Sequence, residues 1–167
     1  MFALLSIVVA CYSILTFTRN LIWKDKLTLW NDTVRKSPQK ARPYHNRGNA
    51  YKEKGEFDRA LSDYDKALAI DPDLAITYAN RGITHQSKGN FNQAISDFNK
   101  ALALDSDLAL AYNGRGAIYK SEGNLGLALS DYNQAIAKDP NVASAYVNRG
   151  NVYQMKGNLN LALSDYN

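Results

Sequence analysis

The sequence has few of the residues from which disulfides, metal centres and catalytic groups are built. It contains one cysteine, Cys11, which excludes a disulfide within the chain. The two histidines, His45 and His85, are far apart, and neither has a cysteine or a carboxylate at metal-ligand spacing. There is no glycine-rich phosphate loop and no recurring Ser/His/Asp grouping. We therefore predict no metal, no cofactor and no catalytic residue, so that this chain is not an enzyme by itself.

Net charge is small over most of the chain. The sequence has 20 Lys and Arg against 16 Asp and Glu, a net charge of +4. Residues 1–42 hold seven of the basic residues and two of the acidic ones, so the remainder is close to neutral. A near-neutral region offers no basic stripe that could follow a phosphate backbone, and we predict no nucleic-acid partner. The basic excess lies beside the most apolar segment, where it would face lipid headgroups.

That apolar segment is Phe2–Phe17, which carries no charge. Its sixteen residues are slightly fewer than the roughly 20 that span a bilayer, and the following residues up to Trp23 bring it into range. A signal peptide is disfavoured because no Lys or Arg precedes the run. Val8–Cys11 loosely fits a lipoprotein cleavage box, but the apolar run continues past Cys11. We predict a transmembrane helix over residues 1–20, a membrane localisation and lipid contacts through this helix and its basic flank. The side of the membrane stays open.

The rest of the chain repeats with a period of 34 residues. Four glycines, four tyrosines and four alanines each recur at this step: Gly48, Gly82, Gly116 and Gly150; Tyr44, Tyr78, Tyr112 and Tyr146; Ala60, Ala94, Ala128 and Ala162. Self-similarity at such a period is typical of a solenoid, in which each unit buries its apolar face against its neighbours.

Each unit is expected to form two helices. Tyr44, Gly48 and Tyr51 follow helical steps, and Gly55 ends that helix as a left-handed residue. A second helical pattern runs from Phe57 to Leu68 and stops before Pro72. In later copies an asparagine precedes the second helix and is expected to cap it: Asn90, Asn124 and Asn158. The unit is therefore two antiparallel helices joined by a tight turn.

These residues resemble the signature of the tetratricopeptide repeat (TPR) family. The aromatic–Gly–Tyr spacing is present as Tyr44-x3-Gly48-x2-Tyr51, and the later series is Ala60, Tyr64, Ala67 and Pro72. Departures are mild, since His85 replaces the second tyrosine and Ser106 the proline of one copy each. The resemblance implies an all-α, right-handed TPR solenoid of antiparallel helix pairs, preceded here by the transmembrane helix. Its units are 41–74, 75–108, 109–142 and a truncated 143–167.

Residues 21–40 also show a helical pattern. Trp23, Leu27, Trp30 and Val34 have helical spacing, and Pro38 lies 34 positions before Pro72. We interpret the segment as a juxtamembrane helix, the second helix of a degenerate half repeat. It would cover the open end of the first unit.

The arrangement as a whole is also similar to bacterial polytopic membrane proteins related to glycosyl- and O-mannosyltransferases. Such proteins often end in a last transmembrane helix, a Trp-rich juxtamembrane helix and TPR units. The residues that carry the resemblance here are Arg19-Asn20-x2-Trp23, Leu29-Trp30 and Lys36-Ser37-Pro38. This resemblance implies a catalytic membrane domain upstream of Met1. The end of the chain at Asn167, within a helical pattern, likewise suggests a fragment.

Two polar sets recur in register. An arginine before each signature glycine and an aspartate sixteen residues later are predicted to form structural ion pairs: Arg47–Asp63, Arg81–Asp97, Arg115–Asp131 and Arg149–Asp165. The second set is expected to line a peptide-binding groove on the first helices: Asn46, Asn49, Asn80, Ile83, Asn113, Asn148 and Asn151.

The asparagine row resembles the asparagine ladder of the O-GlcNAc transferase TPR superhelix, which implies contacts with the backbone of an extended peptide. Gly114 interrupts the row. The chain does not resemble the chaperone carboxylate clamp, because Ala79, Leu110 and Gly114 stand where that clamp needs Lys and Arg. The alternative is that these asparagines are simply tolerated on a solvated face.

Two functions remain open at this point. The first is a membrane-anchored scaffold that binds a protein or extended peptide in its concave groove. The second is the acceptor-presenting C-terminal region of a membrane glycosyltransferase, whose transmembrane segments would precede Met1.

Overall fold

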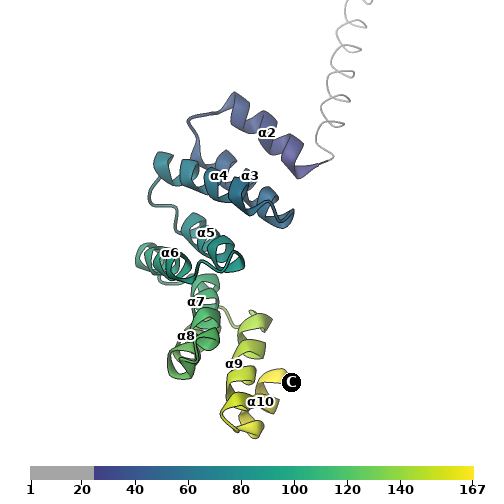
Figure 1. The fold of residues 1–167 in the computed structure, drawn as a ribbon, viewed down its shortest axis with the longest axis vertical. Helices are drawn as coiled ribbons and strands as arrows, with labels where there is room; N and C mark the ends of the chain where they lie inside the picture. The colour runs from purple at the N-terminus through teal and green to yellow at the C-terminus, as the bar shows by residue number, and fades with distance from the viewer. Residues whose placement is uncertain (1–24) are drawn as a thin grey trace, which may run out of the picture. The chain divides into compact units, whose positions relative to one another are not determined.

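The computed structural model describes residues 25–167, which form nine α-helices and no strand (Figure 1). The chain divides into two compact units, one that ends at Ile70 and one from Asp71 to Asn167. The all-α class is thereby confirmed for the part of the chain that the structure describes. Within that part, no helix is both long and apolar enough to cross a membrane. The transmembrane helix predicted over residues 1–20 lies outside the described residues.

Residues 25–70, the described part of the first unit, form three helices. Helix α2 spans Lys26–Lys36, α3 spans Ala41–Glu53 and α4 spans Phe57–Ile70. Helices α3 and α4 form the first hairpin, and α2 packs against α3; Val34 of α2 is buried. The juxtamembrane helix was expected to reach Lys40, but it ends at Lys36, because Pro38 disfavours helical backbone at the residue before it.

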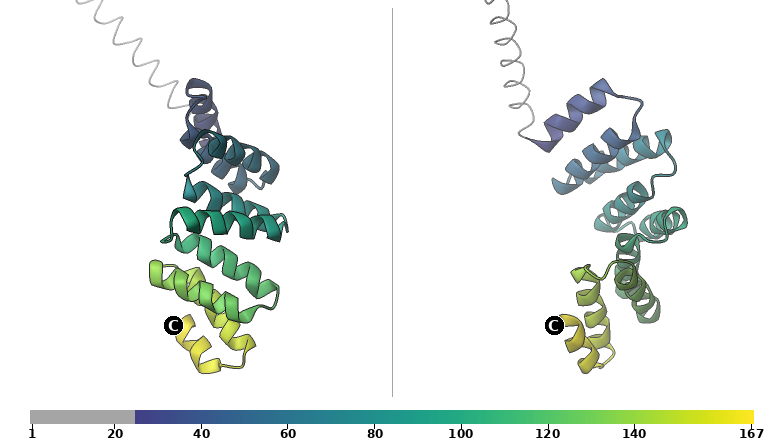
Figure 2. Two further views of the ribbon diagram at one scale, coloured as in Figure 1. Left: turned by 90° about the vertical axis from the view of Figure 1, so that its left-hand side faces the viewer. Right: turned by 180° about the vertical axis from the view of Figure 1, so that it is seen from behind.

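The second unit contains three hairpins, which are seen from two sides in Figure 2. Their helices are α5 (Ala75–Ser87) with α6 (Phe91–Leu104), α7 (Ala109–Ser121) with α8 (Leu125–Lys138), and α9 (Ala143–Met155) with α10 (Leu159–Tyr166). Within this unit α6 packs on α7 and α8 packs on α9, and α7 also contacts α5 and α9. The name "first helices" denotes α3, α5, α7 and α9 throughout.

The tight turns within the hairpins follow one pattern. Gly89 has a φ of 78°, its N–H donates to Gln86 O, and the N–H of Asn90 donates to His85 O. This is a Schellman motif, which needs a left-handed residue and satisfies carbonyls at the end of α5. The other turns repeat it at Gly55, Gly123 and Gly157, where φ is 76–79°. The predicted helix breaks at these glycines are confirmed.

The predicted asparagine caps are wrong. Asn90, Asn124 and Asn158 do occupy the position before the second helix, but none makes a side-chain capping hydrogen bond. Their ψ angles are 61–65°, whereas a capping side chain needs extended backbone to reach the N–H groups of the first turn. The Schellman turn sets this backbone geometry, so it overrides the preference of the residue type.

The links between hairpins of the second unit depend on an aspartate. Asp105 Oδ1 accepts a hydrogen bond from the N–H of Asp107 at 2.9 Å, and Asp139 Oδ1 accepts one from Asn141 at the same distance. Such Asx turns fix the chain direction by themselves. Ser106 can therefore replace the proline without a change in the link.

The core pairs a signature glycine with an aromatic ring of the same hairpin. A Cβ atom on Gly116 would lie 2.9 Å from Cε1 of Tyr132, which is fully buried. Gly82 has the same relation to Phe98, and Gly48 to Tyr64. The glycine is needed because the ring occupies the space that a side chain would take.

Candidate binding face

The predicted arginine–aspartate pairs are all brought together. Arg47 Nε and Nη2 donate to the two oxygens of Asp63, both at 2.7 Å. The corresponding distances in the later hairpins are 2.6–2.9 Å. Only 3–5% of Asp63, Asp97 and Asp131 is exposed. These are bidentate contacts to buried carboxylates, which makes them part of the fold.

The arginines make further contacts that were not predicted from the sequence. The Nη1 group of Arg115 donates to Asn99 on the preceding second helix, and Arg149 reaches Asn133 in the same way at 2.7 Å. The Arg115 guanidinium also lies 5.7 Å from the Tyr112 ring. In the first unit Arg47 donates to Asn31 of α2 at 3.1 Å. The sequence does indicate these contacts, because the three partner asparagines, Asn31, Asn99 and Asn133, fall on the 34-residue period.

These contacts explain why the arginines are not available to a partner. The hydrogen bond to Asp131 is the main cause that raises the pKa of Arg115, and burial opposes it. Arg47 and Arg149 have raised pKa values through the equivalent bonds to Asp63 and Asp165. The guanidinium groups stay charged and bound within the hairpins, so a binding face has to be made by other residues.

The asparagines predicted to line a groove differ in their surroundings. Asn80 is buried, and its amide donates to Ile76 O within its own helix at 3.1 Å. It is therefore not presented to a partner. Asn46 is half-buried on α3. The interruption of the row at Gly114 has a steric cause, because a Cβ there would lie 2.5 Å from Cζ of Phe98.

Asn113 and Asn148 form a connected amide network between α7 and α9. The Asn148 Nδ2 group donates to Asn113 Oδ1 at 3.1 Å, and Asn113 Nδ2 donates to Ser144 Oγ at 3.2 Å. Lys120 Nζ donates to Asn148 Oδ1 at 3.3 Å. All four side chains are at least partly exposed. Lys120 and Ser144 were not predicted from the sequence, because Ser144 does not recur in the other units and Lys120 recurs in only one of them, as Lys52.

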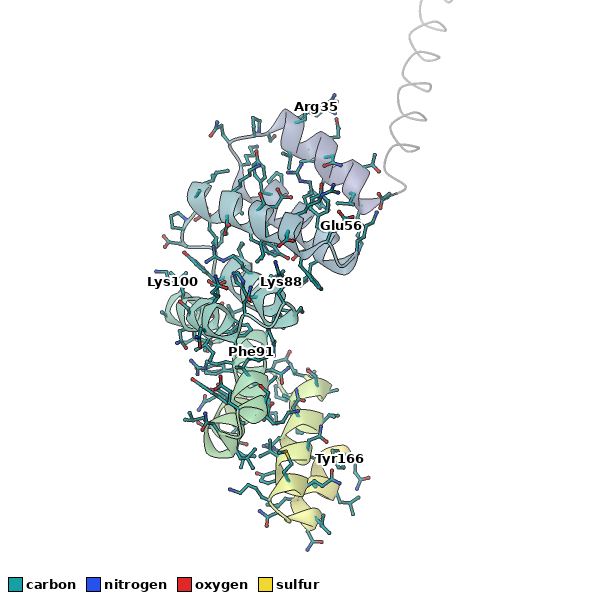
Figure 3. All side chains as sticks on the ribbon, viewed as in Figure 1. Arg35, Glu56, Lys88, Phe91, Lys100 and Tyr166 are labelled. Atoms are coloured by element: carbon teal, nitrogen blue, oxygen red, sulfur yellow. The ribbon has the colours of Figure 1, made fainter. Side chains whose placement is uncertain are left out.

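Asn49 and Asn151 serve their own hairpins. Asn49 Oδ1 accepts from the hydroxyl of Tyr64 at 2.7 Å, and Asn151 accepts from Tyr166 at 2.8 Å; Figure 3 labels Tyr166. Ile83, at the same position of its unit, packs against the core cluster that contains Phe98. The residue at this position therefore suits the ring of the second helix in its own hairpin. Asn49 and Asn151 accept from a tyrosine hydroxyl, and Ile83 packs in the cluster that contains phenylalanine.

His45 lies next to Asn49 on α3. The Asn49 amide nitrogen is 3.0 Å from His45 Nε2, and the His45 ring centroid is 6.0 Å from that of Tyr64. Because Asn49 Oδ1 accepts from Tyr64, its NH₂ group faces His45, which accepts as a neutral imidazole. Burial lowers the pKa of His45, and the charges of Lys52 and Arg42 lower it further.

Residues 25–167 contain no group of His, Cys, Asp and Glu that could hold a metal ion. His85 Nε2 lies 3.9 Å from Asp97 Oδ2, where it borders the ion pair made by Arg81. The two histidines thus lie in different hairpins: His45 is next to Asn49 and Tyr64, and His85 is next to Asp97.

Comparisons with known proteins agree with this geometry. A family model described as "TPR repeat" matches residues 48–89 and 116–157, and one described as "Tetratricopeptide repeat" matches residues 75–108. No curated protein sequence matches the chain.

Among solved structures, the crystal structure of MamA is similar at a TM-score of 0.72 and 24% identity, over 84% of this chain and 82% of that one. The first TPR of Spaghetti (RPAP3), bound to the HSP90 peptide SRMEEVD, has a TM-score of 0.67 and 30% identity, over 71% and 94%. The Arabidopsis OM64 TPR domain has a TM-score of 0.67 and 24% identity, over 69% and 95%.

Proposed function

Because the chain belongs to the tetratricopeptide repeat family, we propose that it is a non-catalytic scaffold that binds an extended segment of a partner protein through α5, α7 and α9, the first helices of its second unit. The right-handed solenoid that the repeats predict would place these helices along its concave side. Support comes from the first TPR of Spaghetti, which is similar to this chain and binds a peptide.

The observation that carries this proposal is the amide network of α7 and α9. Asn113 and Asn148 come from consecutive first helices and are joined directly, at 3.1 Å. An extended chain advances roughly 3.3 Å per residue. Because the two amides touch, they would meet backbone groups of the same residue or of adjacent residues of a bound segment. Backbone contacts do not depend on the side chains of the peptide, so we expect modest affinity and broad preference.

The test is to change Asn113 and Asn148 together to alanine and to measure binding to a library of extended peptides by fluorescence anisotropy. Each lost hydrogen bond should cost about 0.5–1.5 kcal/mol of binding free energy. Asn92→Ala is the matched control, because Asn92 is an exposed asparagine on the second helix α6. Equal binding by the double variant and the control would contradict the proposal, provided that circular dichroism shows all of them folded.

We further propose that residues 1–20 anchor the scaffold in a membrane. The uncharged run Phe2–Phe17 and the basic residues that follow it support this. The full chain should then sediment with membranes after an alkaline wash, whereas a chain that begins at residue 21 should be soluble and helical. A truncated chain that still needs detergent would show that the anchor is misplaced.

The glycosyltransferase hypothesis is the alternative to a free-standing scaffold. It rests on the resemblance of residues 19–38 to the membrane-proximal part of those proteins. In that case the first helices would present acceptor polypeptides to an upstream active site. The gene sequence before Met1 distinguishes the two, since the alternative requires further transmembrane segments there.

A further inference from the structure

The amide network of α7 and α9 has more hydrogen-bond donors than it uses. Its members are Asn113 and Lys120 of α7 and Ser144 and Asn148 of α9. The hydrogen bonds within the network run from Asn148 to Asn113, from Asn113 to Ser144 and from Lys120 to Asn148. Each amide nitrogen keeps a second N–H group, the serine keeps its hydroxyl hydrogen, and the ammonium group keeps two N–H groups. The network therefore suits a ligand that only accepts hydrogen bonds.

Lys120 gives this network a positive charge that the described part of the chain does not neutralise. Its Nζ group donates to an amide oxygen, Asn148 Oδ1, at 3.3 Å, and no carboxylate of residues 25–167 forms an ion pair with it. The arginine on each of α5, α7 and α9 is instead bound to a buried aspartate of its own hairpin. These three helices contain no Asp or Glu that would repel an anion. A carboxylate is anionic and only accepts hydrogen bonds, so it suits both the charge and the donors.

The side of α7 that carries Lys120 also has a small residue. Asn113, Ala117 and Lys120 are spaced by four and three residues, which places them on one side of the helix. The other units have asparagine or isoleucine at the position of Ala117. Only a methyl group therefore stands between the amide and the ammonium group along this side. Lys120 is half-buried, so an ion pair made there is screened less than one between fully exposed side chains.

Exposed apolar side chains lie on the same helices as the network. Leu110 is 38% exposed and precedes Asn113 by three residues on α7, and Val147 is 48% exposed and adjacent to Asn148 on α9. Ile76 of α5 is 40% exposed and holds the position of Leu110 in its own unit. A segment that covers these side chains on α5, α7 and α9 runs past the network and does not end at it. This favours the carboxylate of a side chain over that of a C-terminus.

We propose that the network selects extended segments in which one internal aspartate or glutamate, flanked by apolar residues, pairs with Lys120. The amides of Asn113 and Asn148 hold the backbone beside this residue, and the ammonium group holds its carboxylate. The inference rests on the proposed function, since it names the class of segment that α7 and α9 bind. All of the residues that carry it belong to the second compact unit.

The experiment uses the tightest peptide from the library screen, with its C-terminus amidated. Each position of this peptide is changed in turn to glutamate and to glutamine, and binding to the full chain is measured by fluorescence anisotropy. At one position, or at two adjacent ones, we expect glutamate to bind about three- to tenfold tighter than glutamine. This difference should shrink as salt screens the pair, and it should be absent at the other positions.

The variant Lys120→Gln should remove the glutamate preference, because it loses the charge but keeps a donor at the end of the side chain. Lys120→Arg should retain the preference, and Lys120→Glu should replace it with a preference for lysine over glutamine at the same peptide position. Lys100→Gln is the matched control, because it removes the same charge at an exposed position of the second helix α6, which Figure 3 labels. Circular dichroism should show that all four variants are folded.

Equal affinities for glutamate and glutamine at every position would overturn the inference, and so would a preference that survives in Lys120→Gln. If the glutamine form gains affinity through Lys120 only when its C-terminus is a free carboxylate, a terminal-carboxylate site replaces the one proposed. A peptide whose binding needs Asn113 and Asn148 but shows no glutamate preference would leave the proposed function standing without this inference. A library without any binding peptide would contradict the proposed function itself, and this inference with it.

Discussion

The hydroxyl of Tyr64 donates a 2.7 Å hydrogen bond to Asn49 Oδ1, and the third repeat lacks this relationship. There the tyrosine is Tyr132, and alanine, Ala117, stands at the position of the asparagine. The Tyr132 hydroxyl is buried and has no hydrogen-bond partner among residues 25–167. Burial raises the pKa of Tyr132, with a smaller contribution from Asp131. The second repeat avoids the problem, because it has Phe98 and Ile83 at the two positions.

The same substitution at the two tyrosines should therefore have opposite effects. Tyr64→Phe removes a hydrogen bond and should lower the free energy of unfolding by about 0.5–1.5 kcal/mol. Tyr132→Phe removes a buried hydroxyl without a protein partner and should leave stability unchanged or raise it. Urea unfolding followed by circular dichroism measures both. Similar losses in the two variants would show that the Tyr132 hydroxyl has a partner in solution.

Restoring the missing partner is a separate test. Ala117→Asn places an amide where Asn49 and Asn151 have theirs, so it should satisfy the Tyr132 hydroxyl and raise stability by about 0.5–1 kcal/mol. In the Tyr132→Phe background the gain should vanish. A gain that persists there would have to come from something other than the hydroxyl.

The Arg115–Asp131 pair should be costly to break from one side. Arg115→Leu leaves a carboxylate that is only 5% exposed without its bidentate partner, and we expect a loss of about 3–5 kcal/mol. Lys138→Gln is the comparison, since it breaks an exposed 2.7 Å pair with Asp107 and should cost far less. A double-mutant cycle with Asp131→Asn measures the coupling energy, which would be zero if the two residues did not meet in solution.

Glycine-to-alanine changes should separate packing from helix propensity. Gly116→Ala puts a Cβ 2.9 Å from the buried Tyr132 ring and should destabilise the protein by about 1–3 kcal/mol. Gly126→Ala is the matched change on α8, where nothing lies within 4 Å of the added atom. It should be neutral or stabilise by up to about 1 kcal/mol, because alanine favours helix. Thermal unfolding should occur at a lower temperature in Gly116→Ala and at an unchanged or higher temperature in Gly126→Ala.

His45 should make stability depend on pH in the mildly acidic range. Its pKa in the folded protein lies below the ordinary 6.5, so the unfolded chain binds the proton more readily. Its contribution to stability is complete above pH 6.5 and is lost as the pH falls towards the folded pKa, by at most about 1.4 kcal/mol per pH unit. Denaturant unfolding at about pH 7.5 and about pH 5.5 should show a smaller loss for His45→Gln than for the parent chain. Equal losses would mean that His45 does not titrate differently on unfolding.

The sequence alone determined the helix pairs and their ends. Glycine at each turn accepts the left-handed backbone that other residues avoid, and the 34-residue period places Arg47 and Asp63 on facing helices. These are local or repeated properties, so they follow from residue type and spacing.

Which polar side chain faces a partner was decided by the tertiary structure. Three asparagines that the sequence assigns to one groove have different neighbours: Asn49 meets a tyrosine hydroxyl, Asn80 bonds its own helix, and Asn148 joins Asn113 on the neighbouring first helix. A residue's helical position fixes its direction, but its hydrogen-bond partner often lies on another helix, where single replacements such as Phe98 and Ala117 break the repeat. Such differences between units act through contacts between residues 15 to 35 positions apart. The repeat pattern describes what the units share, so it does not show them.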